Sequence, residues 1–136
     1  MTITEKVKQQ LIERALRIRA RAYAPYSKYN VGASLLTESG DIFDGVNVEN
    51  AVNSAGICAE RNAAFQAVAD GHRIFRAVAV ATDNGGSPCG SCRQVLSEFG
   101  LDIEVYTLDS QGKIIMETTI GELLPDAFGP QHLPKE

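Results

Sequence analysis

The sequence lacks tryptophan altogether and contains only three cysteines and two histidines among its 136 residues. Three cysteines, an odd number, do not make the disulfide framework that holds small secreted domains together. No stretch approaches the 18 or so apolar residues of a membrane-spanning helix. Residues 1–10, MTITEKVKQQ, also lack the apolar segment of a secretory signal. We therefore expect a cytoplasmic protein without a membrane partner.

The chain also lacks an excess of positive charge, because 13 basic and 17 acidic side chains give a net charge of −4 at pH 7. This balance disfavours nucleic acid as a partner. Seven basic and only two acidic groups nevertheless fall within residues 1–28, and Arg14, Arg17 and Arg21 have the spacing of one helix face. That face indicates either a nucleic-acid contact or an ordinary solvated surface. The second interpretation is better supported, since no stacking aromatic accompanies the arginines.

Length and composition predict a single domain over residues 1–136, with 44% hydrophobic and 22% charged residues. Hydrophobic periodicity and turn residues predict its elements. Helices are expected over about 4–22, 58–69, 89–99 and 120–124, the first with a capping box from Thr2 to Glu5. Strands are expected over 31–36, 42–46, 75–81, 103–108 and 114–118. The alternation predicts an α/β fold, with one sheet of about five strands and helices packed against its faces.

The spacing of the cysteines carries the first chemical signal. Cys89 and Cys92 are separated by two residues, as in half of a zinc site or in a redox pair. The presence of a third cysteine, Cys58, favours a metal site over a redox pair. Cys58 and Cys89 each begin an expected helix, where the positive helix end stabilises a thiolate.

A structural zinc site has four protein ligands, whereas a catalytic one has three and keeps a position for water. His72 lies at the far end of the helix that Cys58 begins, about 20 Å away along its axis, and His132 lies in the tail. We therefore expect three cysteine ligands and an open site. Glu60 begins the same helix as Cys58, so its carboxylate is a candidate to move protons beside the metal.

These residues belong to a larger pattern. Cys58-Ala59-Glu60 and Pro88-Cys89-Gly90-Ser91-Cys92 match the signature of zinc-dependent nucleobase deaminases in its three-cysteine form. The chain resembles the small zinc-dependent cytidine deaminases through further blocks in the same order. They are YAPYSKY at 23–29 with VGA at 31–33, NVENA at 47–51, CAER at 58–61, PCGSCRQ at 88–94 and ELLP at 122–125.

The resemblance implies a three-layer α/β/α fold with a mixed sheet, and hydrolysis of free cytidine and 2′-deoxycytidine to the uridine products and ammonia. One Zn²⁺ per subunit would be held by Cys58, Cys89 and Cys92, and a zinc-bound hydroxide would attack C4 of the base. Glu60 would be the proton shuttle. Arg61 would donate hydrogen bonds to the ligand sulfurs, unless it is an ordinary surface arginine.

The resemblance also implies a substrate site and an assembly. Asn47 and Glu49 would bind the ribose 3′-hydroxyl, and the backbone of Ala59 would contact the pyrimidine. Tyr29 stands where relatives usually have phenylalanine against the base, and Phe128 matches an aromatic residue that reaches the ring from a neighbouring subunit. Core packing is the other interpretation of either aromatic side chain. The implied assembly is a homotetramer whose sites are completed by neighbouring subunits.

The sequence is also compatible with other functions. Asn53 stands where many relatives have an aromatic residue, and this departure could admit N4-substituted cytidines. The same metal chemistry could act on an aminonucleoside such as blasticidin S, or on a base in tRNA or DNA. The NVENA block and the acidic net charge favour a free nucleoside. A structural zinc module is the non-catalytic alternative.

Overall fold

The protein is described by a computed structural model over residues 3–134. Its five strands form one sheet in the order β2-β1-β3-β4-β5. β3 and β4 are parallel and the other neighbours are antiparallel, so the sheet is mixed, as predicted. The strands are β1 (Gly32–Thr37), β2 (Ile42–Val46), β3 (Phe75–Ala81), β4 (Glu104–Leu108) and β5 (Ile114–Thr119).

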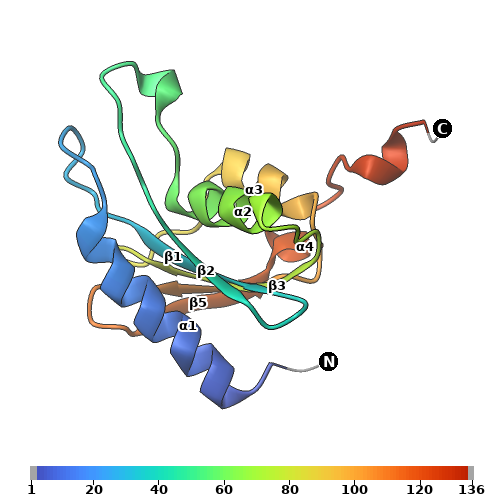
Figure 1. The fold of residues 1–136 in the computed structure, drawn as a ribbon, viewed down its shortest axis with the longest axis horizontal. Helices are drawn as coiled ribbons and strands as arrows, with labels where there is room; N and C mark the ends of the chain where they lie inside the picture. Colours follow the sequence, from blue (N-terminus) through green and yellow to red (C-terminus); the bar gives the residue numbers. More distant parts are fainter. Residues whose placement is uncertain (1–2, 135–136) are drawn as a thin grey trace.

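Helices cover both faces of this sheet (Figure 1). α1 (Glu5–Ile18) lies on one face, and α2 (Ala59–Ala69) and α3 (Gly90–Ser97) lie on the other with the short α4 (Ile120–Leu123). The three-layer α/β/α prediction is therefore confirmed. No helix within residues 3–134 is long and apolar enough to cross a membrane.

The central strand β3 separates two hydrophobic clusters. Its alanines at 77, 79 and 81 pack in the cluster that contains Leu11 and Ala15 of α1. Phe75, Val78 and Val80 pack in the cluster that contains the buried alanines of α2. A strand covered on both faces reads as a continuous apolar run, which is why this run predicted a central position.

Two glycines let the helices approach the sheet closely. A Cβ atom at Gly45 of β2 would lie 2.5 Å from the carbonyl oxygen of Ala59 in α2, and one at Gly32 of β1 would lie 2.3 Å from the carbonyl oxygen of Ala15 in α1. Neither distance leaves room for a side chain. The first turn of α2 is therefore seated directly on β2.

The element boundaries differ from the prediction at some ends. α1 stops at Ile18 and continues as a 3-10 turn over Arg19–Arg21, where the amide of Ala22 bonds the carbonyl of Arg19. The predicted capping box is wrong: the N-cap is Thr4, whose hydroxyl accepts from the amide of Val7 at 3.2 Å, while Thr2 lies outside the described residues. The short 3-10 helices over 53–55 and 130–132 were not predicted.

The arginine face of α1 is partly used within the fold. Arg14 makes a two-pronged ion pair with Asp44 of β2, with Nε 3.1 Å from Oδ1 and Nη2 3.1 Å from Oδ2. Arg17 and Arg21 are exposed. Arg14 therefore joins α1 to the sheet beneath it, which is a structural role. Only Arg17 and Arg21 of the three arginines are left as candidates for a nucleic-acid contact.

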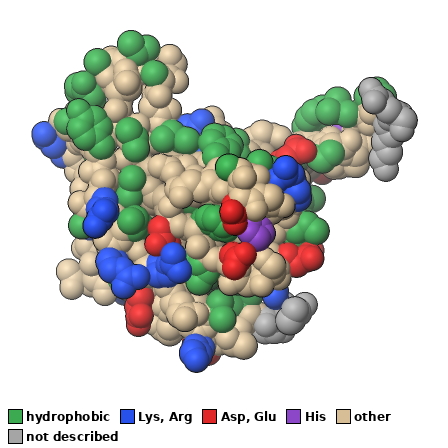
Figure 2. Space-filling view, viewed as in Figure 1, with side chains coloured by type: hydrophobic (Ala, Val, Ile, Leu, Met, Phe, Trp, Pro, Cys, Tyr) green, Lys and Arg blue, Asp and Glu red, His purple; other side chains and the backbone are tan. Residues whose placement is uncertain are grey.

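Two segments extend from the layered body (Figure 1). Residues 47–57 form an arm that carries the 3-10 helix Asn53–Ala55, and the C-terminal tail carries the 3-10 helix Pro130–His132. Hydrophobic side chains gather on the surface of the arm (Figure 2). Val52 of the arm is exposed, as are Tyr23 and Tyr26 in the segment before β1.

Candidate active site

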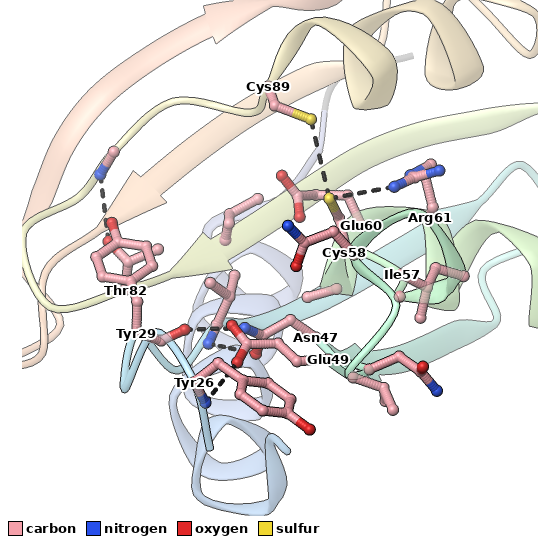
Figure 3. A pocket seen from close by; sticks show the side chains of 18 of the residues that line it. Tyr26, Tyr29, Asn47, Glu49, Ile57, Cys58, Glu60, Arg61, Thr82 and Cys89 are labelled. Atoms are coloured by element: carbon pink, nitrogen blue, oxygen red, sulfur yellow. Dashed lines mark hydrogen bonds between the residues drawn. The ribbon is translucent and has the colours of Figure 1, made fainter. Parts of the chain in front are cut away.

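The three cysteine side chains meet where α2 and α3 begin. Cys58 is the N-cap of α2, Cys89 is the N-cap of α3, and Cys92 lies one turn into α3. Neither N-cap side chain makes a capping hydrogen bond to a backbone amide of its own helix. Both thiols are thus free to face the space between the helix ends, where Cys58 and Cys89 point toward one another (Figure 3).

The sulfur atoms have the separations that a shared metal ion requires. Sγ of Cys58 lies 3.8 Å from Sγ of Cys89, which lies 3.4 Å from Sγ of Cys92, and all three lie within 4.8 Å of one another. Two sulfurs at about 2.3 Å from one tetrahedral zinc ion are about 3.8 Å apart. The donor set therefore fits zinc, and a group of three thiols fits a metal site better than a two-cysteine redox pair.

The thiols differ in how easily they ionise. The pKa of Cys58 falls to about 5, because its thiolate accepts hydrogen bonds from the Cys92 thiol and from Arg61. The pKa of Cys92 is raised by its interaction with Cys58 and by burial. Cys92 is fully buried, whereas Cys89 is exposed. Cys58, at the N-terminus of α2, therefore ionises more readily than Cys92.

Arg61 carries the positive charge nearest to this thiolate. Its Nη2 atom donates to Sγ of Cys58 at 3.4 Å, and the contact raises the pKa of the guanidinium further. Nε of Arg61 is buried and has no hydrogen-bond partner among the described residues. The structure thus places Arg61 against the sulfur and not on the open surface.

Glu60 lies beside the thiols in the first turn of α2 and is only 5% exposed. Burial raises the pKa of its carboxyl group to about 7. A carboxyl group with such a pKa can accept and return a proton near neutral pH, which is the property that general acid–base chemistry needs.

A cavity of about 420 Å³ opens in front of Glu60 and the thiols. Figure 3 shows Cys58, Glu60, Arg61 and Cys89 at one end and Tyr26, Asn47 and Glu49 at the other. The cavity brings together eight of the ten predicted site residues. These are Tyr29, Asn47, Glu49, Cys58, Ala59, Glu60, Arg61 and Cys89.

Asn47 and Glu49 hold the segment that precedes β1. Oδ1 of Asn47 accepts from the amide of Val31 at 2.9 Å, and its Nδ2 donates to the carbonyl of Tyr29 at 2.8 Å. The Glu49 carboxylate accepts from the amides of Tyr26 and Ser27 and from the Ser27 hydroxyl. These bonds, led by the Ser27 hydroxyl, lower the pKa of Glu49.

The wall formed by residues 82–87 was missed as part of the site. The Thr82 hydroxyl accepts from the amides of Asn84, Gly85 and Gly86, at 3.3, 2.7 and 3.2 Å. It shapes a tight loop that lines the cavity through Thr82, Gly86 and Ser87. The two glycines in this stretch and the proline that follows it, Pro88, indicated a loop, but nothing in the sequence indicated where the loop would lie.

The remaining two predicted site residues do not line the cavity. Cys92 is fully buried with its Sγ atom 3.4 Å from that of Cys89, and Phe128 is 58% exposed on the tail, where its ring stacks on His132. His72 contacts Asp41 and Asp70 at the other end of α2. Within residues 3–134, the metal-competent group that includes the cysteines contains no histidine.

Comparison with known proteins agrees with this geometry. The family model for the cytidine and deoxycytidylate deaminase zinc-binding region matches residues 5–108. A cytidine deaminase from Sporosarcina psychrophila is 48% identical over 128 residues, covering 92% of this chain and 93% of that protein. The crystal structure of a cytidine deaminase from Burkholderia pseudomallei has a TM-score of 0.84 at 46% identity, covering 93% of this chain and 100% of that one. A Bacillus cereus blasticidin-S deaminase is more remote, at 31% identity over 109 residues, 73% of this chain and 76% of that protein.

Proposed function

Because the chain belongs to the cytidine and deoxycytidylate deaminase family, we propose that it hydrolyses free cytidine and 2′-deoxycytidine to uridine and 2′-deoxyuridine, with release of ammonia. The observation that carries the proposal is a cavity whose one end has a buried carboxyl group and two thiols of the three-cysteine group, and whose other end has hydrogen-bonding side chains. This separation suits a nucleoside, whose reactive base and sugar lie at opposite ends.

Cys58, Cys89 and Cys92 would hold one zinc ion per chain. Three thiolates without a redox task favour zinc over iron. Zinc, when bound, supplies a Lewis acid that makes water nucleophilic near neutral pH. Arg61 donates to Cys58 and offsets part of the negative charge that three thiolates bring together.

Glu60 would take a proton from the attacking water and deliver it to N3 of the cytosine ring. After water has added at C4, Glu60 would take the second proton from the new C4 hydroxyl group and pass it to the departing amine, so that the C4–N bond breaks and the carbonyl group forms. The carboxyl group suits both steps, since burial brings its pKa to about 7. It lies on a helix turn fixed against β2, so little reorganisation is needed as the proton moves.

Asn47 and Glu49 would bind the sugar, with the 3′-hydroxyl as the expected partner. Each still has hydrogen-bonding capacity after holding the segment before β1, because an amide offers two donors and two acceptor positions and a carboxylate about four acceptor positions. The backbone of Ala59 would contact the pyrimidine, and the ring of Tyr29 would pack against the base.

We further propose that residues 1–136 form a single cytoplasmic domain that assembles into a homotetramer. The exposed ring of Phe128 does not line the cavity of its own chain, which supports a role in completing the site of a neighbouring subunit. Cytidine and deoxycytidine differ at one hydroxyl group, and we expect both to be substrates in pyrimidine salvage.

The alternatives have less support. The relative that acts on blasticidin S is more distant than those named as cytidine deaminases. Activity on N4-substituted cytidines would depend on the space left by Asn53, a residue of the arm that lines the cavity. Nucleic acid remains disfavoured by the net charge of −4, and tight binding of tRNA at moderate salt in a gel shift would overturn this interpretation.

The ultraviolet absorbance of cytidine tests the proposed reaction and its metal together. Pure protein loaded with zinc should convert the cytosine band to that of uracil, with one ammonia released per base. Protein stripped by a chelator should be inactive and should recover on addition of zinc. Activity that is insensitive to the chelator would contradict the metal role, and no conversion by zinc-loaded protein would contradict the proposed function.

A further inference from the structure

Arg93 follows Cys92 in α3, and its side chain holds three acceptors at once. Nε donates to the carbonyl of Pro88 at 2.8 Å, Nη1 to the carbonyl of Leu123 at 2.8 Å, and Nη2 to the hydroxyl of Ser87 at 2.9 Å. The residue is half-buried. Three short bonds from one planar fork define the position of all three acceptors, which a lysine could not do.

Two of these acceptors belong to the residues directly before Cys89. The backbone amide of Arg93 also donates to the carbonyl of Cys89 at 3.0 Å. Arg93 therefore fixes the main chain on both sides of the Cys89 α-carbon, through its side chain at Pro88 and through its amide at Cys89. The third acceptor, Leu123, is the last residue of α4, so the clamp is anchored on a separate element.

Cys89 needs such a clamp more than the other two cysteines do. Cys92 is enclosed within α3 and Cys58 is held by Arg61, but Cys89 is exposed and follows a loop with two glycines. The contacts that the structure gives the Cys89 side chain are with the other two sulfurs. The direction of its thiol therefore depends on the backbone of residues 87–89.

We propose that Arg93 is a positioning residue that preorganises the Cys89 thiol for the metal, an inference that rests on the proposed metal role of the three cysteines. One helical turn thus carries a metal-binding thiol at Cys92 and the clamp for another at Arg93. The clamp slows metal loss, because dissociation through Cys89 requires the segment 87–89 to move against the two hydrogen bonds that the Arg93 side chain makes to Ser87 and Pro88.

Zinc release to a chromogenic chelator tests this role. Arg93→Gln should accelerate release about 10- to 100-fold, the range for partners that orient metal ligands. Arg93→Lys should give an intermediate rate, and added guanidinium ions should slow release from an Arg93→Ala protein. The Michaelis constant for cytidine should change less than kcat, since Arg93 does not line the cavity.

Arg73 provides the matched control. It also bonds two carbonyls, those of Val68 and His72, but at the far end of α2. Arg73→Gln should release zinc at the wild-type rate. The proposal would be overturned if the two glutamine variants released zinc at the same rate, or if Arg93→Gln released it at the wild-type rate. A lower melting temperature of the metal-free Arg93→Gln protein would not change that conclusion.

Ser87→Ala keeps the test decisive if Arg93→Gln does not fold, because it removes one acceptor and keeps the arginine. It should accelerate release by a smaller factor, and a wild-type rate would overturn the clamp. The two proposals remain distinguishable. A wild-type chain that binds no zinc would contradict the proposed function, whereas zinc binding that does not depend on Arg93 contradicts this inference alone.

Discussion

The hydroxyl of Tyr29 lies 2.7 Å from Oδ1 of Asn84, so the segment before β1 is joined to the loop after β3 at the wall of the cavity. The loop leaves little space at this point, because a Cβ atom at Gly86 would lie 3.0 Å from the same hydroxyl. A phenylalanine at position 29 could not make this contact. The wall is therefore fixed by a bond that depends on tyrosine.

Replacing Tyr29 with phenylalanine should loosen this wall while keeping the ring. We expect the Michaelis constant for cytidine to rise a few-fold with kcat little changed, in line with one hydrogen bond worth about 1 kcal/mol. Steady-state kinetics measure the effect, and Tyr23→Phe, at an exposed tyrosine outside the cavity, is the control. An unchanged Michaelis constant would show that the hydroxyl has no role in binding.

Glu60→Gln should separate chemistry from metal binding. The amide keeps the shape of the side chain but cannot accept and return the proton, so kcat should fall at least about 100-fold. Zinc content and the unfolding midpoint should stay close to those of the wild type. Glu98→Gln, at an exposed carboxylate just after α3, should be fully active. A Glu60→Gln enzyme with normal turnover would exclude the shuttle.

Alkylation of the metal-free protein should follow the ionisation order of the thiols. At pH 7 iodoacetamide should modify Cys58 well before Cys92, because the first has a pKa of about 5 and the second is buried with a raised pKa. Zinc should protect both. Peptide mass spectrometry measures how fast each cysteine is alkylated, and the urea-unfolded chain gives the alkylation rates without the influence of the fold. Modification that zinc does not slow would argue against ligation.

The contribution of Glu49 to stability should depend on pH. Its pKa in the folded protein is lowered from 4.5, so the carboxylate stabilises the fold above pH 4.5 and this contribution is lost as the pH falls through the lowered value. The difference in urea midpoint between wild type and Glu49→Gln should therefore be full at pH 7 and shrink below pH 4.5. Glu38→Gln, at an exposed turn, is measured alongside as the surface control. A difference that is constant with pH would contradict the assignment.

Gly45→Ala tests the seating of α2 on β2. The added methyl group would meet the backbone at Ala59 and Ala63, so we expect a loss of about 1–3 kcal/mol or more in the free energy of unfolding. Gly90→Ala adds a methyl group where nothing lies within 4 Å, and should be close to neutral. Chemical denaturation compares the two, and equal midpoints would mean that α2 can shift away from the strand.

Local pattern was enough to predict the sheet, the helices and the residues that meet at the thiol end of the cavity. The apolar run at 75–81 predicted the buried central strand because it is covered on both faces. Cys58 and Cys89 were predicted at helix starts, and each is an N-cap. The elements depend on residues that are close in sequence. The metal site could be predicted because the chain has only three cysteines, so few sets of ligands are possible.

Contacts between distant segments could not be predicted in this way. The pairing of Arg14 with Asp44 spans 30 residues, and the bond between Tyr29 and Asn84 spans 55. The N-cap at Thr4 was missed because Thr2, with Glu5 three residues later, matches the capping-box pattern, whereas Thr4 has Val7 at that spacing. The part played by residues 82–87 likewise follows from the fold and not from their own sequence.

The convergence of two helix starts on one group of sulfurs also has a consequence for the unfolded chain. Cys58 and Cys89 are 31 residues apart, and a metal ion held by both is a reversible cross-link that closes a loop containing α2 and β3. A permanent cross-link around a loop of this length removes chain entropy worth about 3–4 kcal/mol from the unfolded state. The ion would therefore stabilise the fold as well as take part in the chemistry. The free energy of unfolding would then increase with the concentration of free metal ion.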